Sequence, residues 1–201
     1  RGVALEALGH FDAALASYDR AIAFDPRNAD AHLNRGVVLA ALARNEDELA
    51  SYDRAIALKP DHAEAWSNRG SSLFALARVA DALESCDRAI AIDPNHADAR
   101  HNRSFCHLLA GDFARGLPDY EWRKRKRAPV GNRAFSRPLW LGAPDPAGKT
   151  ILVHDEQGYG DTIQFSRYLP VLKERGAQVL FAPRPELRTL MRSLGEGIAI
   201  V

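Results

Sequence analysis

The sequence Asp-Arg-Ala-Ile-Ala occurs three times, at residues 19–23, 53–57 and 87–91. Each copy starts 34 residues after the one before it, and a proline follows each copy. A fixed period of this length is typical of proteins built from stacked helical hairpins, because one pair of antiparallel helices makes one repeat. Since proline does not fit in a helix interior, each proline is expected to end the second helix of its unit. The N-terminal part of the chain is therefore predicted to be an array of helical repeats.

Small residues stand at equal positions in successive units. When Ala29, Ala63 and Ala97 are counted as position 1, position 8 holds Gly36 and Gly70. Glycine at this point lets the two helices of a unit approach closely. Together with the alanines at position 27, the prolines at position 32 and a tryptophan at position 4, these marks resemble the tetratricopeptide repeat. The resemblance implies that the units stack into a right-handed superhelix with a concave side.

Four units are readable over residues 1–127. The first is cut, with Gly2 at position 8, and the fourth departs from the pattern with Ser104 in place of glycine. The second helix of that fourth unit is expected to be a closing element. In the second unit Glu48 replaces the usual alanine of position 20, so we expect the packing to depart from the pattern there.

The concave groove of such a superhelix is lined by the first helix of each unit, and the resemblance assigns two rows of residues to it. At position 5 the chain lacks the lysine of the carboxylate clamp found in chaperone-binding relatives, so chaperone C-termini are disfavoured. The amides at position 6 can hydrogen-bond an extended peptide, as in the similar superhelix of O-linked N-acetylglucosamine transferases. The alternative is that these asparagines only solvate the groove, and the acids at position 2 would attract basic segments weakly. The rows are Asn34, Asn68 and Asn102 at position 6, and Asp30, Glu64 and Asp98 at position 2.

Composition bounds the remaining classes. The chain has 201 residues, 46% of them hydrophobic and 26% charged, with a net charge of +1. No apolar run is long enough to span a bilayer. Cys86 and Cys106 are expected to be buried thiols, and neither they nor the histidines show a metal-binding spacing, so no metal and no cofactor is predicted. A reducing, cytoplasmic location is the default expectation.

Charge is distributed unevenly along the chain. Residues 1–120 hold 13 basic and 18 acidic side chains, whereas residues 121–201 hold 14 and 8. The basic run at residues 123–127 stands at the end of the last repeat helix, where cations are favoured by the helix dipole. No aromatic side chains are interleaved with it, so a nucleic-acid surface is not predicted. Residues 128–149, rich in proline and glycine, are predicted to be a linker.

After residue 150 the pattern changes from helical to mixed. Apolar strands are predicted at residues 151–154, 178–182 and 198–201, with helices at 161–175 and 185–194. This alternation predicts the start of a parallel, Rossmann-like sheet, so the fold class is α + α/β. Such sheets bind ligands at the carboxyl ends of their strands, which places a site in the loop at residues 155–161.

This loop continues as Glu-Gln-Gly-Tyr-Gly-Asp-Thr-Ile-Gln-Phe over residues 156–165. It is not a dinucleotide fingerprint, because Ile163 stands where the third glycine would be. The segment is similar to the C-terminal part of bacterial tetratricopeptide proteins whose last domain resembles heptosyltransferases of the GT-B fold. The resemblance implies that Asp161 is the base that deprotonates an acceptor hydroxyl; the alternative is that Asp161 only caps the helix. The predicted substrate contacts are Gln157, Gly158, Gly160, Thr162 and Gln164.

Two functions of different classes therefore stay open. In the first, the repeats recruit a polypeptide or other partner for a glycosyltransferase that uses a nucleotide sugar. In the second, the protein is a non-catalytic scaffold whose glycosyltransferase-like domain is vestigial. Because three strands make an incomplete sheet, we expect the 201 residues to be part of a longer protein and to be inactive alone.

Overall fold

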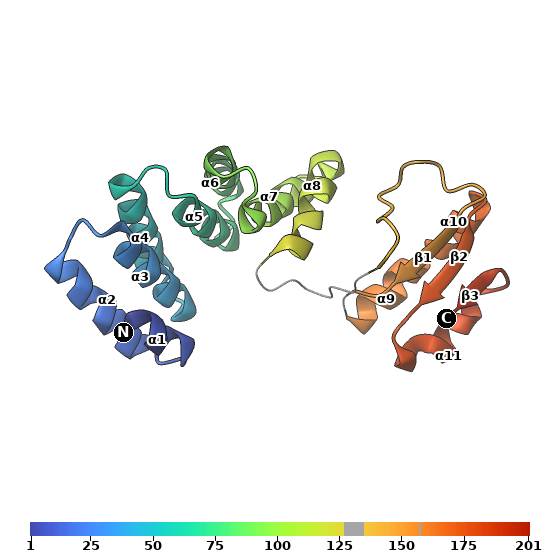
Figure 1. Cartoon of the computed structure of the whole chain (residues 1–201), viewed down its shortest axis with the longest axis horizontal. Coiled ribbons are helices and arrows are strands. Elements are labelled where there is room, and N and C mark those ends of the chain that lie inside the picture. Colours follow the sequence, from blue (N-terminus) through green and yellow to red (C-terminus); the bar gives the residue numbers. More distant parts are fainter. Residues whose placement is uncertain (127–134, 157) are drawn as a thin grey trace. The chain divides into compact units, whose positions relative to one another are not determined.

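The computed structural model describes residues 1–126, 135–156 and 158–201. The chain divides into two compact units, Arg1–Arg127 and Ala128–Val201 (Figure 1). The first unit is entirely helical in its described residues, and the second contains a parallel sheet. We call them the repeat unit and the sheet unit and describe each by itself. Within the repeat unit, a first, second, third or fourth unit, or successive units, means single helical hairpins.

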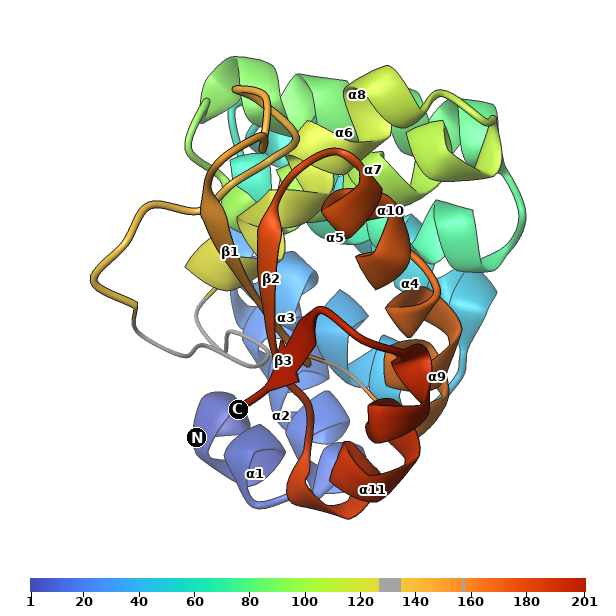
Figure 2. The ribbon, with the colours of Figure 1, turned by 90° about the vertical axis from the view of Figure 1, so that its right-hand side faces the viewer.

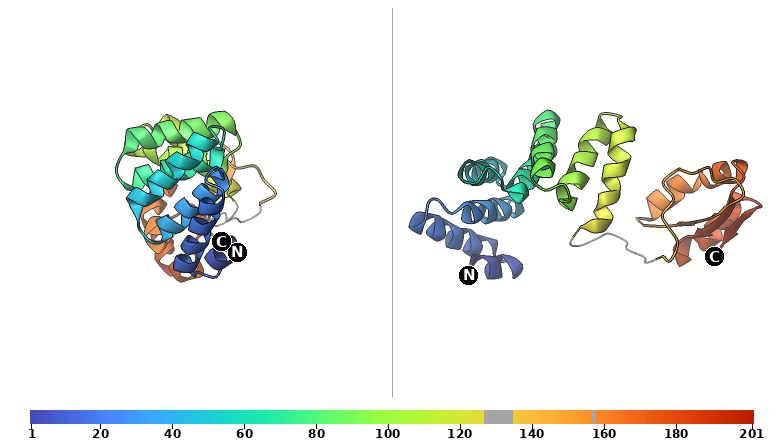
Figure 3. Two further views of the ribbon diagram at one scale, coloured as in Figure 1. Left: turned by 90° about the vertical axis from the view of Figure 1, so that its left-hand side faces the viewer. Right: turned by 45° about the horizontal axis from the view of Figure 1, so that its top comes forward.

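Four helical hairpins make up the repeat unit, as the 34-residue period predicts (Figure 3). Within each hairpin two antiparallel helices pack together, and the second helix also packs on the first helix of the next hairpin. The hairpins are α1 (Gly2–Ala7) with α2 (Phe11–Phe24), α3 (Ala29–Ala41) with α4 (Asn45–Leu58), α5 (Ala63–Ala75) with α6 (Val79–Ile92), and α7 (Ala97–Leu109) with α8 (Phe113–Tyr120).

Helix ends follow the predicted period closely. Asp25, Lys59 and Asp93 close the second helices in an extended conformation, with ψ of 91, 86 and 98°. Each of the three precedes a proline, which disfavours helical geometry in the residue before it. The proline of each unit thus sets the turn into the next hairpin.

The turn inside each hairpin has a residue in the left-handed region at the same repeat position. Gly9 and Gly111 have φ of 74 and 76°, and the equivalent alanines, Ala43 and Ala77, have φ of 56 and 59°. The left-handed region costs an L-residue roughly 1–2 kcal/mol because Cβ approaches the following carbonyl. Glycine in the outer units relieves this strain, and the alanines of the inner units retain it.

We therefore expect Ala43→Gly to stabilise the repeat unit by about 0.5–1 kcal/mol, since relief of the strain exceeds the added entropy of an unfolded glycine. The matched control is Ala40→Gly, inside α3, which should destabilise by a similar amount. Chemical denaturation of both variants measures the difference. Equal destabilisation by both changes would show that the turn is not strained.

Glycine at position 8 makes room for a bulky side chain of the second helix. A Cβ added at Gly2 would lie 2.7 Å from the ring of Tyr18, and one added at Gly36 would clash with Tyr52. Tyr52 is 2% exposed. In the third unit the same place is taken by the smaller Cys86, whose Sγ would lie 2.7 Å from a Cβ at Gly70. Both cysteines are free and buried, as predicted.

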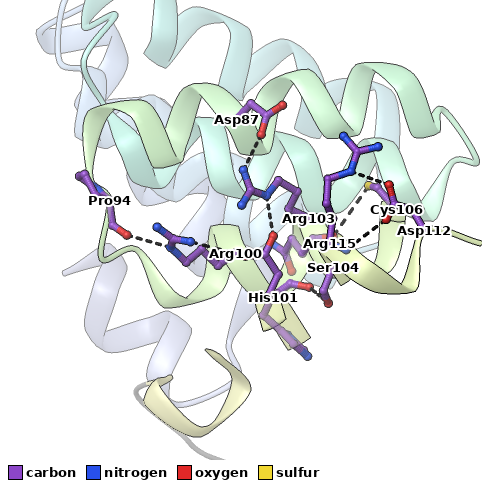
Figure 4. A network of polar contacts seen from close by, with 11 residues as sticks. Asp87, Pro94, Arg100, His101, Arg103, Ser104, Cys106, Asp112 and Arg115 are labelled. Atoms are coloured by element: carbon purple, nitrogen blue, oxygen red, sulfur yellow. Dashed lines mark hydrogen bonds and ion pairs between the residues drawn. The ribbon is translucent and has the colours of Figure 1, made fainter. Parts of the chain in front are cut away.

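An arginine at position 7 joins successive units. Arg35 pairs with Asp19 at 2.7 Å, and Arg69 pairs with Asp53 at 2.7 Å. Each of these two arginines also donates to a serine on the second helix of its own unit. Figure 4 shows the last member of the row, Arg103, reaching Asp87 at 2.8 Å. The repeated Asp-Arg-Ala-Ile-Ala sequence therefore supplies, with its aspartate, an ion pair at each junction.

The second helix of the fourth unit departs from the others, as its sequence predicts. It is α-helical over α8, which contains Pro118, and then continues as the 3-10 helix η1 (Glu121–Arg125). Its tyrosine, Tyr120, lies near the rings of His101 and Phe105, at 5.5 and 6.2 Å between centroids. In the first two hairpins the equivalent rings, Tyr18 and Tyr52, lie against a glycine, and Ser104 stands at that glycine position in the fourth hairpin.

The sheet unit holds three parallel strands in the order β1-β2-β3. Ile151 pairs with Val179, and Val179 with Ile198, so alternate residues of all three strands share one face. Leu169, Leu187 and Met191 cover that face and complete a single core. The elements are β1 (Thr150–His154), α9 (Tyr159–Ser166), α10 (Leu169–Glu174), β2 (Gln178–Ala182), η2 (Pro185–Leu187), α11 (Arg188–Met191), η3 (Arg192–Leu194) and β3 (Ile198–Ile200) (Figure 2).

Two predictions for this unit need correction. One helix was expected over residues 161–175, but the structure has two. Helix α9 ends at Ser166, before Arg167, and α10 begins at Leu169, after Tyr168. Pro170 has no N–H to donate to the preceding turn, so it is tolerated only in the first turn of a new helix. The helix expected over residues 185–194 is α-helical only in α11, with a 3-10 turn on each side.

Candidate functional site

The first helices of the repeats form one continuous surface, because α5 packs against both α3 and α7. We call this surface the α3–α5–α7 face. Asn34, Asn68 and Asn102 stand on it at the same position of successive helices, and all three are half-buried. Among the described residues, no hydrogen bond engages the side-chain amides of Asn34 and Asn68. The Asn102 amide donates to the Ser67 carbonyl on the neighbouring helix at 3.4 Å, so it is partly occupied.

The acidic row of position 2 is paired with cations or histidines of the repeat unit. Asp30 lies 3.1 Å from Nε2 of His62, and Glu64 lies 3.2 Å from Nε2 of His96. Both histidines belong to the next unit along the chain. The third acid, Asp98, pairs with Lys126 at 2.8 Å. The row was expected to attract basic segments. In the structure each of its carboxylates already contacts a side chain of the repeat unit, and of these partners only Lys126 carries a permanent positive charge.

One of these histidines, His96, also caps a helix. Nδ1 of His96 accepts the N–H of Ala99 at 3.2 Å and so caps α7, while its Nε2 faces Glu64. A neutral ring protonated at Nε2 makes both contacts. The hydrogen bond to Glu64 raises the pKa of His96, although burial opposes this shift. Both histidines therefore link successive repeats. The described residues contain no cluster of side chains that could hold a metal ion.

The side chains at position 4 make an equivalent hydrogen bond in three successive repeats, although their residue types differ. His32, Trp66 and Arg100 differ in chemistry, yet each N–H donates to the carbonyl of the proline six residues before it, at 3.2, 3.0 and 2.8 Å. Figure 4 shows the Arg100 contact with Pro94. Each turn between units is therefore fastened by a side chain of the following helix.

The basic run after the last repeat is engaged within the repeat unit. Arg123 is 7% exposed and donates to Glu121, which Lys124 also contacts at 2.9 Å. Arg125 lies over the ring of Trp122, and Lys126 pairs with Asp98 as described above. Arg127 lies outside the described residues. These contacts hold the described basic side chains of the run against the repeat unit.

A second group of predicted residues lies at the carboxyl end of β1. Gly158 is the N-cap residue of α9, and Asp161 stands in the first turn. The interpretation of Asp161 as the helix cap is therefore wrong, because the N-cap position, Gly158, lies three residues before Asp161. Asp161 is exposed, and no described hydrogen bond uses its carboxylate.

The other predicted contacts differ in accessibility. Gly160 and Gln164 are exposed. Thr162 is buried, and its hydroxyl donates to the Gly158 carbonyl at 3.2 Å, so the structure assigns it to the helix turn rather than to an open surface. Gln157 lies outside the described residues.

Sequence reasoning missed an ion pair beside this loop. Asp155, directly after β1, has a side chain only 4% exposed and accepts from Nε of Arg184 at 2.8 Å. The guanidinium of Arg184, which follows β2, lies 5.2 Å from the ring centroid of Tyr159. The sequence did contain a signal for this ion pair. Both charged residues follow predicted strands, and the carboxyl ends of parallel strands lie at the same edge of a sheet.

Comparison with known proteins concerns the repeat unit. A family model described as "TPR repeat" matches residues 2–42, and one described as "Tetratricopeptide repeat" matches residues 49–97. The helical unit is built of tetratricopeptide repeats. The sheet unit lies outside both matched ranges, and no curated protein matches the chain.

Several solved structures have a fold similar to that of part of this chain. The chain is similar to MamA, at 25% identity over 62% of this chain and 72% of that one, with a TM-score of 0.56. A MamA structure from Desulfovibrio magneticus RS-1 gives 19% identity, coverage of 63% and 74%, and a TM-score of 0.55. The chain is also similar to the first tetratricopeptide domain of Spaghetti (RPAP3), solved with the HSP90 peptide SRMEEVD. The identity is 24%, over 55% of this chain and 87% of that one, and the TM-score is 0.53.

The described residues include no helix long and apolar enough to cross a membrane.

Proposed function

We propose that the tetratricopeptide repeats bind an extended segment of a partner protein along the α3–α5–α7 face. The observation that carries this proposal is the pair of half-buried amides, Asn34 and Asn68, at equal positions of stacked helices and without described partners. One amide can donate to a peptide carbonyl and accept from a peptide N–H. Two amides one repeat apart therefore suit the main chain of an extended ligand.

The side chains of this face favour hydrogen bonds to the main chain of a peptide over ion pairs with its charged side chains. The acids at position 2 already contact His62, His96 and Lys126 of the repeat unit. Position 5 lacks the lysine of a carboxylate clamp. The Spaghetti repeat domain, whose fold is similar, is bound to a peptide, which supports the general mode but not the same sequence preference. We expect weak dependence of the affinity on salt.

Replacement of Asn34 and Asn68 by alanine tests the proposal. A peptide selected on the wild-type protein from a random library is expected to lose about 0.5–1.5 kcal/mol for each lost hydrogen bond, measured by calorimetry. Asn102→Ala should have a smaller effect because that amide already contacts Ser67. The matched control is Asn95→Ala, in the exposed turn before α7. Unchanged affinity in the double variant would remove the asparagines from the binding site.

We also propose that residues 150–201 begin a glycosyltransferase-like domain, joined by a linker at residues 128–149 to the repeats at residues 1–127. Three parallel strands in the order β1-β2-β3 are compatible with one half of a Rossmann-like sheet. The specific observation that favours chemistry is the exposed carboxylate of Asp161, which no described hydrogen bond engages. In this proposal it takes the proton of an acceptor hydroxyl as that oxygen attacks a nucleotide sugar and the nucleotide leaves.

The competing function is a scaffold in which the repeats bind a partner and the sheet unit transfers nothing. A cytoplasmic location belongs to either proposal and agrees with two buried, unpaired thiols. Sugar transfer by the protein, including any residues encoded after Val201, distinguishes the two functions. The substitution that probes the transfer step is described in the Discussion.

A further inference from the structure

An equivalent contact recurs wherever the second helix of one unit meets the first helix of the next. At the first junction, Ala14 and Val38 are fully buried in one cluster, and at the third junction Ala82 and Cys106 occupy the same repeat positions in another. Both contacts are apolar. At the middle junction the corresponding residues are Glu48 on α4 and Ser72 on α5, and their side chains are joined by a hydrogen bond.

Glu48 is 5% exposed, and no described charge compensates it. The helices that pack most extensively against α4 are α3 and α5. On α4 itself Tyr52 is buried, Asp47 pairs with Arg44, Asp53 pairs with Arg69, and Glu46 and Arg54 are exposed. Each titratable group of α3 and α5 contacts another partner: Asp30 with His62, His32 with the Pro26 carbonyl, Arg35 with Asp19, Glu64 with His96, and Arg69 with Asp53.

Proton counting favours the neutral form of Glu48. The Ser72 hydroxyl lies 3.0 Å from the Asn68 carbonyl and also contacts the Glu48 carboxyl, but it has only one proton. A carbonyl accepts and cannot donate. If Glu48 is protonated, it donates to Ser72 Oγ, and Ser72 donates to the carbonyl, so all three groups are satisfied. An ionised Glu48 competes with the carbonyl for the single proton.

We propose that Glu48 is a proton-dependent lock between the second and third repeats, closed by a protonated carboxyl and loosened when that carboxyl ionises. The pair Glu48–Ser72 thus replaces a permanent apolar contact with one that responds to pH. Burial raises the pKa of Glu48, and the hydrogen bond to Ser72 lowers it less strongly. For an acid with a raised native pKa, the stability is complete below the unfolded-state value and falls as pH rises towards the native value.

Hydrogen exchange of the backbone amides in α4 and α5 tests the lock. At each pH the opening constant of wild type is compared with that of Glu48→Gln, which keeps the size and hydrogen bonding but cannot ionise. This ratio is expected to rise between about pH 4 and about pH 8, about tenfold for each unit by which the pKa is raised. The control Glu46→Gln, exposed on the same helix, should leave the wild-type pH dependence unchanged. A ratio that is constant across this range would overturn the proposal.

A second variant tests the lock independently of the Glu48→Gln substitution. Glu48→Ala with Ser72→Val reproduces the residue types of the first junction, and its opening constant should be lower than that of wild type at about pH 8. If Glu48→Gln fails to fold, the carboxyl ¹³C resonance of Glu48 in wild type is titrated directly. A midpoint above that of exposed Glu46 supports the lock, and an equal or lower midpoint overturns it.

Discussion

Replacing Arg103 with methionine is expected to destabilise the repeat unit by about 3 kcal/mol, the lower end of the range for breaking a buried ion pair. The Asp119 side chain is 7% exposed and accepts from Nε of Arg103 at 2.6 Å. Without Arg103, its nearest cation is Arg100, at 3.5 Å. A carboxylate left nearly uncompensated in the interior costs far more than the pair contributes, and the remaining Arg100 contact keeps the loss at the lower end.

The matched control is Arg69→Met, the same change at the same repeat position. Arg69 pairs with Asp53, whose side chain is 58% exposed, so this substitution should cost about 1 kcal/mol or less. Urea denaturation monitored by helical circular dichroism measures both. Equal losses would mean that burial of the partner carboxylate is not what matters.

A compensating change sharpens this experiment. The residue equivalent to Asp119 in the two preceding units is serine, at Ser51 and Ser85. Asp119→Ser in the Arg103→Met background removes the unpaired charge and should restore most of the lost stability. Failure of this rescue would assign the loss to the packing of the arginine stem.

Asp161→Asn is expected to reduce sugar transfer by about 10²- to 10⁴-fold if the sheet unit belongs to a glycosyltransferase. Asparagine has nearly the same shape but cannot take a proton. The helix should remain intact, because Gly158 rather than Asp161 is the N-cap residue. Loss of a carboxylate from the first turn weakens the dipole interaction by about 0.3–1 kcal/mol.

The measurement compares transfer from a panel of nucleotide sugars by wild type, Asp161→Asn and a control, Glu174→Gln, at the last residue of α10. Melting temperatures are recorded for all three. Full activity of Asp161→Asn would exclude it as the base. An inactive wild type would favour the scaffold function.

The repeat unit could be predicted from sequence because its period, prolines and small residues recur every 34 residues. The contacts that link the units could not be predicted in the same way. Asp30 and His62 are 32 residues apart, and the sequence alone shows an acidic row without its partners. The position 4 contacts are hidden because His32, Trp66 and Arg100 share only an N–H donor of suitable reach.

In the sheet unit, the strands were predictable from their apolar residues, with β1 beginning one residue earlier than expected. The helix boundaries were less predictable because local and tertiary preferences compete. The apolar spacing around Tyr168 indicates one continuous helix, whereas Pro170 requires a new first turn. The Asp155–Arg184 pair depends on how β1 and β2 are aligned, which no local pattern specifies.

Glu48 illustrates a different gap between sequence and structure. Its mismatch with the repeat pattern was visible, but its partner was not, because Ser72 stands 24 residues away in the next unit. Each of the two polar residues is explained by the other, because their side chains hydrogen-bond to each other. The departure from the repeat consensus at Glu48 is thus accompanied by a second departure, Ser72, at the facing position.

The most direct measurement of peptide binding is a side-chain amide NMR spectrum of the ¹⁵N-labelled protein, recorded with and without a selected peptide. We predict that the amide resonances of Asn34 and Asn68 shift on saturation, because both would bond the peptide backbone. The amides of Asn45 and Asn95, which lie outside the α3–α5–α7 face, should not shift. Shifts confined to Asn45 and Asn95, with Asn34 and Asn68 unchanged, would contradict the proposed binding face.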